Sequence, residues 1–359
     1  NTTETDPDWY DYDEKRWANA KSKDGSYWVW IPRYAYKITS GYHSSTTGTI
    51  DVKFLKGKTN FSKENMKIEN TGYEAHVKDT SMHHFLHPAF DFDGGYLGFW
   101  MAKFEPSVSN QKSLCYTDAS VINCNNSINS VKIIPGVNTW RYISIKNAFE
   151  ASFKMKDNVI YGWNPEEIDS HMMTNLEWGA VAYLSKSQFG SEEEVWNNAC
   201  NKHISGCSGL SVSSSSIAEC EKYYTENGQK ASTTHNIYGI YDMSGGAWEA
   251  TTGNMEYQIG NSGFTESDFL DINKKHIDIY SNNVSIMYGD AVYETTSNVL
   301  GYSLGWYNYN SYYPTITTPW YVRGGNYSTG AGAGLFRFNN THGIAYINHT
   351  FRPVLVPIK

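Results

Sequence analysis

The stretch YVRGGNYSTGAGAGLFRF, from Tyr321 to Phe338, carries the pattern from which the fold of the C-terminal part is predicted. Its aromatic and aliphatic ends are typical of short strands, and the glycines between them suit a turn with positive φ. The segments WYVRGGNY, AGLFRF and FRPVLV therefore predict three short strands joined by glycine-rich turns. No Asp, Glu or Lys occurs from Thr295 to Ile358, and we expect the arginines there to anchor strands through carbonyls or carboxylates: Arg323, Arg337 and Arg352.

A stretch this rich in Tyr, Asn, Gly, Ser and Thr favours a ligand-facing surface on a rigid scaffold. Tyr offers a large contact area with little rotamer entropy to lose, and Asn and Ser offer adaptable hydrogen bonds. Low charge avoids the cost of removing water from unpaired ions. The alternative is a structural β-ribbon whose Tyr residues point inward.

The composition of the whole chain limits its class. With 359 residues, of which 40% are hydrophobic, the chain is large enough for a sizeable core. Its net charge of −8 argues against a nucleic-acid partner, and no apolar run is long enough to span a membrane. Because the chain begins at Asn1 without Met, we expect a trimmed or processed product, whose oligomerisation would depend on an upstream module.

The chain predicts two helices between short strands, with long irregular insertions. The segment SYWVWIPRYAYKI predicts a strand from Ser26 to Ile38, and the helical period predicts helices at Thr139–Lys156 and Asn175–Gly190. Two helices among short strands predict an α+β fold. We expect a leader at 1–20, one domain at 21–359 and a binding region at 300–350, with insertions near 108–136, 191–236 and 254–296.

The five cysteines leave two interpretations open. Cys115 and Cys124 enclose one short loop and Cys200 and Cys207 another, so two local disulfides would leave Cys220 unpaired. The other interpretation is five reduced thiols.

Four segments in this order resemble one family: GFWMAKFE, NLEWGAVAYL, YGIYDMSGGAWEAT and the RGGNY…FRPVLV tail. They are similar to the C-type lectin-like fold of the formylglycine-generating-enzyme superfamily. Within it, the chain most resembles the variable proteins of diversity-generating retroelements and related phage or bacterial surface proteins. The resemblance implies a C-type lectin-like α+β domain with two helices, short strands and long insertions.

The same resemblance argues against catalysis. The superfamily's enzymes use two cysteines just after the RGG motif, and those positions fall near Thr329 and Gly334 here. Without a thiol at either position, no copper–thiolate site can form there. The expectation is a non-catalytic protein that requires no cofactor. The alternatives are a formylglycine-generating-type oxidase and a structural virion or pilus subunit.

As in the retroelement-diversified proteins it resembles, the tail would vary at exposed positions between fixed strands and bind a cell-surface protein or glycan of a target cell. The expected location is extracellular, on a phage tail or a bacterial surface. The candidate ligand-binding residues are Tyr307, Asn308, Tyr309, Asn310, Tyr312, Asn326, Tyr327, Ser328, Thr329, Asn339, Asn340, Thr341, His342, Tyr346 and Asn348.

The superfamily's enzymes also imply a structural calcium site in the segment DMSGGAWE. The matching positions are Asp242, Gly245, Ala247 and Glu249, which would supply two carboxylates and two main-chain carbonyls. Oxygen ligands of this kind suit calcium. The alternative is a tight turn in which both carboxylates accept backbone N–H bonds.

Overall fold

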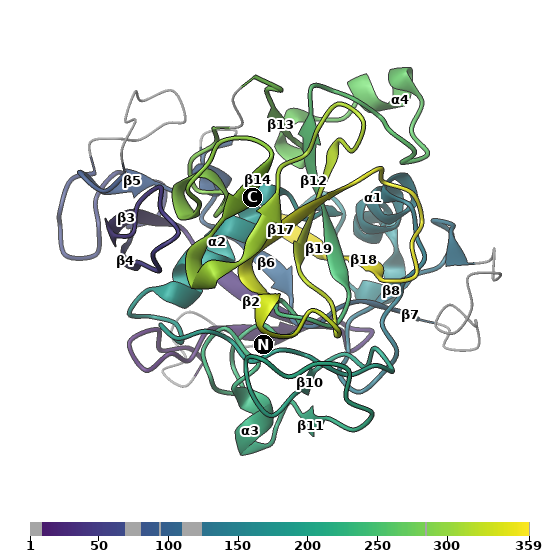
Figure 1. Ribbon diagram of the computed structural model, residues 1–359, viewed down its shortest axis with the longest axis horizontal. Coiled ribbons are helices and arrows are strands. Elements are labelled where there is room, and N and C mark those ends of the chain that lie inside the picture. Colours follow the sequence, from purple (N-terminus) through teal and green to yellow (C-terminus); the bar gives the residue numbers. More distant parts are fainter. Residues whose placement is uncertain (1–8, 69–79, 93–94, 110–123, 284–285, 359) are drawn as a thin grey trace.

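The computed structural model describes residues 9–68, 80–92, 95–109, 124–283 and 286–358. Within these residues the fold contains many short strands and few helices, so the predicted α+β class is confirmed (Figure 1). In Figure 1 two larger sheets and their helices form the centre. A small three-stranded sheet lies at the left, and a loop-rich insertion lies at the bottom.

The first large sheet has five antiparallel strands. Its order is β1 (Asn19–Lys21), β2 (Tyr27–Pro32), β6 (Gly98–Ala102), β19 (Pro353–Pro357) and β9 (Ile168–Met172). Apolar residues alternate along β2, so Val29 and Ile31 enter one core while Trp28 enters another on the opposite face. The C-terminal strand β19 lies between β6 and β9, so both ends of the chain contribute to one sheet.

The second large sheet contains most of the C-terminal strands. Its order is β13 (Asp278–Tyr280), β12 (Trp248–Met255), β16 (Trp320–Gly324) and β17 (Gly334–Thr341), and β18 (His349–Phe351) pairs with β12. The strands β16 and β17 run antiparallel with Arg323 opposite Phe338. The strand pair predicted from the opening stretch is therefore present.

Smaller sheets complete the described strands. They are β4 (Thr49–Phe54), β3 (Tyr34–Ser40) and β5 (Phe85–Leu86); β7 (Ser107–Val108) with β8 (Val131–Lys132); β10 (Cys207–Ser208) with β11 (Glu221–Lys222); and β14 (Tyr302–Leu304) with β15 (Asn310–Tyr312).

The helices include the two that were predicted, both shorter than expected. The helix α2 (Asn175–Lys186) begins at a capping box in which the side chains of Thr174 and Glu177 each accept a backbone N–H of the other residue. The helix α1 (Ile145–Phe153) starts after six residues that the predicted range had included. Two short helices were not predicted, α3 (Glu226–Gln229) and α4 (Glu266–Leu270). None of the helices in the described ranges has both the length and the apolar character needed to cross a bilayer.

The predicted leader at 1–20 packs onto the domain over the part that the structure describes. Trp17 is fully buried, and its indole N–H donates to the carbonyl of Phe189 over 2.8 Å. Tyr12 is also buried, and its hydroxyl donates to the carbonyl of Trp30. Residues 9–20 therefore belong to the fold.

Two buried arginines fix the C-terminal strands, as predicted. The guanidinium of Arg323 donates to the carbonyls of Asp290 and Ala291 and lies over the ring of Trp178, 5.4 Å from its centroid. Arg352 donates to both carboxylate oxygens of Glu249 and to the carbonyl of Ala102, which joins the two large sheets. Both side chains are completely buried.

The cysteine pairing differs from both interpretations of the sequence. Cys207 is bonded to Cys220, whereas Cys200 is a buried free thiol. Cys124 is disulfide-bonded, and its predicted partner Cys115 lies outside the described residues. The unpaired cysteine is therefore Cys200, because the β10–β11 pairing places Cys207 directly opposite Lys222, close to Cys220.

Candidate binding surface

The β14–β15 hairpin displays a row of side chains to solvent. Tyr302 pairs directly with Tyr312 across the two strands, and their ring centroids lie 5.3 Å apart. The strand period of two buries Ser303 and Ser311 and exposes their neighbours. The buried Ser311 hydroxyl accepts from the backbone N–H of Phe338, which ties the hairpin to β17. Of the predicted residues, Asn310 and Tyr312 are exposed here.

The segment between the two hairpin strands turns inward. Trp306 is fully buried, and its indole N–H donates to the carbonyl of Gly41. Tyr309 is only 1% exposed, and its hydroxyl donates to the carboxylate of Glu194 over 2.5 Å. The prediction of Tyr309 as a surface residue is wrong, because Glu194 in a distant insertion offers its hydroxyl a buried partner. Tyr307 is half-buried against the core, and Asn308 is exposed.

The loop at 326–329 is shaped by its own polar side chains. The carbonyl oxygen of the Asn326 side chain accepts from the hydroxyls of Ser328 and Thr329. Asn326 is therefore mostly buried and holds the turn, which corrects its prediction as an exposed contact. Tyr327 is half-buried with its ring edge against His203, at a centroid distance of 4.6 Å, while Ser328 is exposed.

The last predicted group lies along β17 and the segment that follows it. The side-chain amide of Asn340 donates to the carbonyl of Tyr313, and the buried Thr341 hydroxyl accepts from the N–H of Gly343. Thr341 therefore supports a turn and is not an exposed contact. Asn339 and Asn348 are half-buried, and His342 and Tyr346 are exposed.

Arg337 on β17 connects the β14–β15 hairpin with Trp248 on β12. Its guanidinium lies over the ring of Trp248, 5.7 Å from the centroid, and near enough to Tyr302 and Tyr312 for these phenols to influence its pKa. Burial lowers the pKa of Arg337, and its Nε has no hydrogen-bond partner within the described residues. Unlike Arg323 and Arg352, it reaches solvent.

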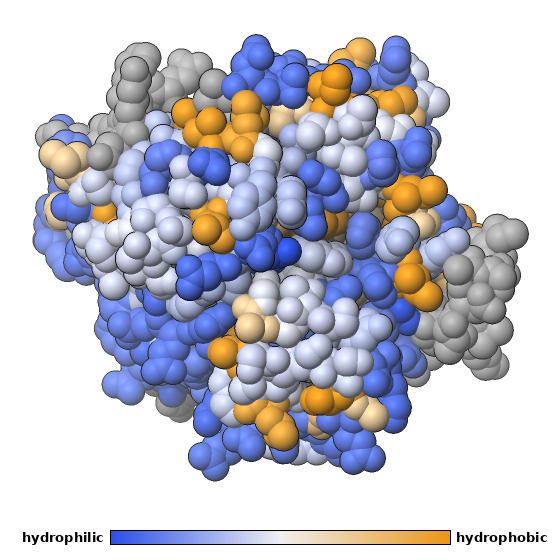
Figure 2. All heavy atoms as spheres, viewed as in Figure 1, coloured by the Kyte–Doolittle hydropathy of each residue, from blue (hydrophilic) through white to orange (hydrophobic). Residues whose placement is uncertain are grey.

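Trp248 in turn connects Arg337 with the residues around β18. Its backbone N–H donates to the carbonyl of Asn348, and it pairs with His349, whose ring lies 5.2 Å from that of Tyr346. We call this continuous set the tail surface: Trp248, Tyr302, Asn310, Tyr312, Tyr327, Ser328, Thr329, Arg337, Asn339, Tyr346 and Asn348. Figure 2 shows the face on which β14, β17 and β18 lie in Figure 1, and much of it is pale, as expected for Tyr, Ser, Thr and Gly.

Three members of this surface were not predicted as ligand contacts. Tyr302 lies just before the predicted run, and the three residues Tyr302–Leu304 are too few to establish a strand period that would have pointed it outward. Arg337 was expected only to anchor a strand. Trp248 belongs to the DMSGGAWE segment, far away in sequence, and no local pattern indicated that it would meet the tail.

The two carboxylates of the predicted calcium site are engaged by protein N–H groups. Asp242 accepts from the backbone N–H groups of Gly206 and Glu105 and from the side-chain amide of Asn198. Glu249 faces the guanidinium of Arg352. Burial alone would lower the pKa of Arg352, but the carboxylate of Glu249 outweighs burial and raises it.

This donor set does not fit a calcium ion. Each carboxylate already holds N–H donors, and a cation beside Arg352 would be repelled. In addition, the Ala247 N–H donates to Glu105, as expected for a hydrogen-bonded turn. Asp242 therefore fits the tight-turn alternative, whereas the carboxylate of Glu249 accepts from the Arg352 side chain and not from backbone N–H groups.

Comparison with solved structures gives a neighbour among the variable proteins. No family model matches the chain, and no curated protein sequence matches it. The chain is similar in structure to Treponema denticola variable protein 1. The two are 11% identical, and the alignment covers 73% of this chain and 86% of the other, with a TM-score of 0.33. At that score the two backbones differ over much of their length, so the tail surface rests on the geometry of this chain alone.

Proposed function

We propose that this chain is a non-catalytic recognition protein whose tail surface binds a protein or glycan on a target cell. The observation that carries the proposal is the position of Arg337. From Thr295 to Ile358 it is the one charged side chain among the described residues that reaches solvent, and it lies among exposed aromatic rings. Arg, Tyr and Trp are the residues in which the binding energy of interfaces is concentrated.

The frame beneath the surface supports the same function. Arg323, Trp178 and the hydrogen bond from the Trp178 indole to the carbonyl of Leu335 hold β16 and β17 in place. A surface held this way has little conformational freedom to lose when a ligand binds, which favours affinity. The exposed side chains above it are then free to make contacts.

The finer assignment is a C-type lectin-like variable protein of a diversity-generating retroelement, displayed on a phage tail or a bacterial surface. Its support is the order of four motifs and the Tyr/Asn-rich tail. The absence of cysteine at Thr329 and Gly334 supports a protein without oxidase activity. The neighbouring DNA tests this assignment: a reverse transcriptase gene beside a near-copy of the tail region, differing at adenines, is the expected finding.

A binding experiment tests the tail surface itself. Fluorescently labelled protein is applied to a panel of intact bacterial cells and to a bacterial glycan array, and each positive target is titrated with the variants Tyr302→Ala, Tyr312→Ala and Arg337→Met. We expect each substitution to weaken binding by about tenfold or more, the cost typical of an interface hot spot. Thermal melting should change little, because these side chains lie at the surface.

Tyr224→Ala is the matched control, because Tyr224 is an exposed tyrosine on the β10–β11 insertion. It should bind every target like the wild type. If the three tail variants also bind like the wild type, the tail surface is not the interface. If they lose binding only as far as their melting temperatures fall, these side chains belong to a structural β-ribbon and not to a binding surface.

A further inference from the structure

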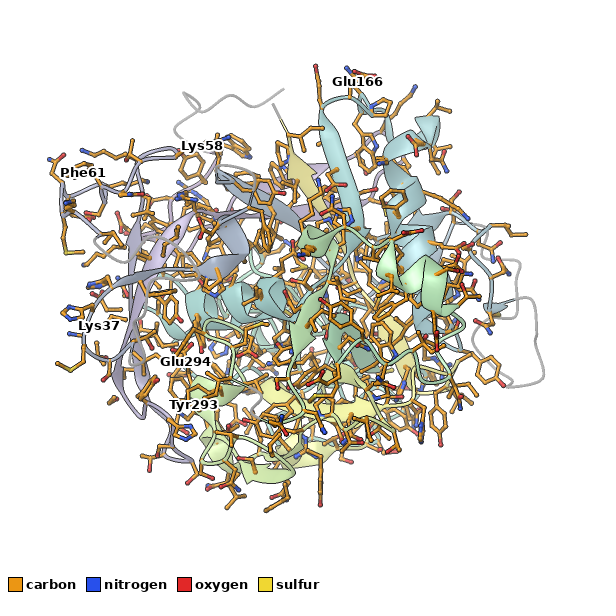
Figure 3. All side chains as sticks on the ribbon, turned by 90° about the horizontal axis from the view of Figure 1, so that it is seen from above. Lys37, Lys58, Phe61, Glu166, Tyr293 and Glu294 are labelled. Atoms are coloured by element: carbon orange, nitrogen blue, oxygen red, sulfur yellow. A yellow bond between two sulfur atoms is a disulfide. The ribbon has the colours of Figure 1, made fainter. Side chains whose placement is uncertain are left out.

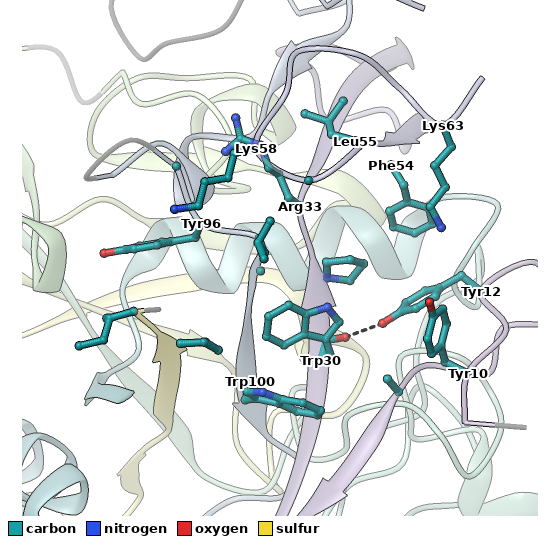
Figure 4. Close-up of a pocket in the computed structure, with 18 of the residues that line it drawn as sticks. Tyr10, Tyr12, Trp30, Arg33, Phe54, Leu55, Lys58, Lys63, Tyr96 and Trp100 are labelled. Atoms are coloured by element: carbon teal, nitrogen blue, oxygen red, sulfur yellow. Dashed lines mark hydrogen bonds between the residues drawn. The ribbon is translucent and has the colours of Figure 1, made fainter. Parts of the chain in front are cut away.

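A second concave site opens away from the tail surface. A cavity of about 810 Å³ lies over β2 and β6, bordered by the N-terminal segment, the end of β4 and the C-terminal end of β19 (Figure 4). In Figure 3 Lys58, which lines this cavity, is at the upper edge of the molecule, whereas the yellow-green strands of the tail lie at the lower edge. We call it the aromatic cavity.

Its floor is made of tryptophan rings on the part of the sheet face that the core around Trp28 leaves open. Trp30 and Trp100 are directly paired across β2 and β6, and their ring centroids lie 5.1 Å apart. Trp9 stacks on Trp100 at 6.4 Å. All three residues are partly exposed, so apolar surface that a helix or another sheet would normally cover faces the cavity.

Its rim is positively charged in an acidic protein. Arg33, Lys58, Lys63 and Lys275 line the cavity, and no Asp or Glu is among its described lining residues, although the chain carries a net charge of −8. Lys275 is paired with the carboxylate of Asp169 at 2.9 Å. That leaves three cations to meet a ligand.

Arg33 is the best-defined of the three. It is 5% exposed, and its Nη1 donates to the carbonyl of Phe90 over 2.7 Å, while its Nε has no partner in the described part of the chain. Asp91 lies close enough to influence Arg33 but does not line the cavity. Lys58 and Lys63 are exposed, and Lys63 lies over the ring of Phe54 at 5.4 Å.

We propose that the aromatic cavity binds an oligosaccharide carrying an acidic group. The flat apolar faces of Trp30 and Trp100 match the C–H faces of sugar rings. The cations at the rim match a uronic-acid carboxylate, and Arg33 can hold it through a charge-assisted hydrogen bond. Tyr10 and Tyr96 add hydroxyl groups at the edge, where they can bond to sugar hydroxyls.

An acidic peptide is the competing ligand class, and the geometry disfavours it. A peptide in extended form pairs its backbone with an exposed strand edge. Here the cavity lies over the faces of β2 and β6, and each of these strands is hydrogen-bonded to neighbours on both sides. The ligand therefore meets side-chain faces, which suits stacked rings.

The test measures binding of a galacturonic acid trimer by quenching of tryptophan fluorescence, with a neutral galactose trimer and a hexaglutamate peptide as comparison probes. We expect the acidic trimer to bind and the other two to bind at least tenfold more weakly. The double variant Lys58→Met/Lys63→Met should lower affinity for the acidic trimer at least tenfold and flatten its dependence on salt. Trp100→Leu should lower it similarly without changing the salt dependence.

Two controls separate this site from the tail surface. Tyr312→Ala and Arg337→Met should bind the acidic trimer like the wild type, whatever they do to binding of whole cells. Lys37→Met, on β3 away from the cavity, should also have no effect. Equal binding of the neutral trimer, stronger binding of the peptide, no binding of the acidic trimer, or an unaffected lysine double variant would each overturn the proposal.

Discussion

Arg352 and Glu249 show how much of this fold depends on single residues. Both are fully buried, and their ion pair is surrounded by further hydrogen bonds to Ala102 and Tyr241. A buried pair of this kind contributes little net stability compared with apolar residues of similar size. Removing one partner, however, leaves the other charge buried without a partner. The pair therefore matters most when one partner is lost.

Arg352→Met should lower the free energy of unfolding by about 3–5 kcal/mol, because Glu249 would keep its carboxylate in the interior without a partner. Urea denaturation measures this loss. Adding Glu249→Gln should recover part of the stability, because it removes the unpaired buried carboxylate. Arg337→Met, at the surface, is the matched control and should cost about 1 kcal/mol or less. Equal losses in the two arginine variants would contradict a structural role special to Arg352.

His87 gives the fold a predictable response to acid. Its ring is enclosed by the rings of Tyr34, Tyr36, Phe90 and Tyr183, and burial lowers its pKa to about 3 from the ordinary value of 6.5. Between these values the unfolded chain binds a proton at His87 that the folded chain does not. The stability contributed by neutral His87 is therefore fully present above pH 6.5 and is lost as the pH falls toward 3.

Urea unfolding of the wild type and His87→Leu at several pH values between 4 and 7 measures this linkage. The stability of the wild type relative to the variant should fall by about 1.4 kcal/mol for each pH unit below 6.5. A constant difference between the wild type and His87→Leu across the range would show that His87 is protonated in the folded protein.

At the scale of elements, the β10–β11 insertion depends on its disulfide. Cys207 and Cys220 are separated by 13 residues, and the segment between them has little regular structure. Closing a loop of about 15 residues contributes roughly 3 kcal/mol by restricting the unfolded chain. We expect the double variant Cys207→Ser/Cys220→Ser to lose stability of that order in urea denaturation.

Cys200→Ala is the control for this element, because Cys200 is a free thiol close to the bridge. It should keep the disulfide and most of the stability. Peptide mapping of the unreduced protein provides an independent measurement. A bridge between Cys200 and Cys207, as the sequence spacing suggested, would contradict the structure.

The accuracy of the sequence-based predictions differed from element to element for physical reasons. The helix at Asn175 and the strands of the tail were predictable, because caps, apolar periodicity and glycine turns are local signals. The helix α2 ends at Lys186, before the predicted stop at Gly190, because Ser187 leaves the helical backbone conformation. The three-residue strands β14 and β15 are too short to establish a period, so the hairpin that presents Tyr302 and Tyr312 was not predicted.

At the scale of the whole molecule, the two candidate sites differ in how far sequence could find them. The tail surface lies mostly within 300–350, so composition alone indicated its region. Burial of Tyr309 could not be predicted, because its partner Glu194 comes from another insertion. The aromatic cavity combines residues from Trp9 to Ile358, and no window of sequence contains it.

The two candidate sites suit two different kinds of ligand. The tail surface is broad and almost uncharged, which suits a macromolecule, whereas the aromatic cavity is concave and cationic, which suits an acidic oligosaccharide. Because they lie at opposite edges in Figure 3, one molecule has room to engage both ligands together.

The outward-pointing side chains of Tyr312 and His342 have a consequence for the history of such a protein. Within the described residues, neither of these side chains makes a hydrogen bond to the frame that Arg323 and Arg352 secure. Natural selection can therefore act on affinity and on foldability separately at these positions. A lineage carrying this chain could acquire new ligands through a few inherited substitutions while its architecture stays constant.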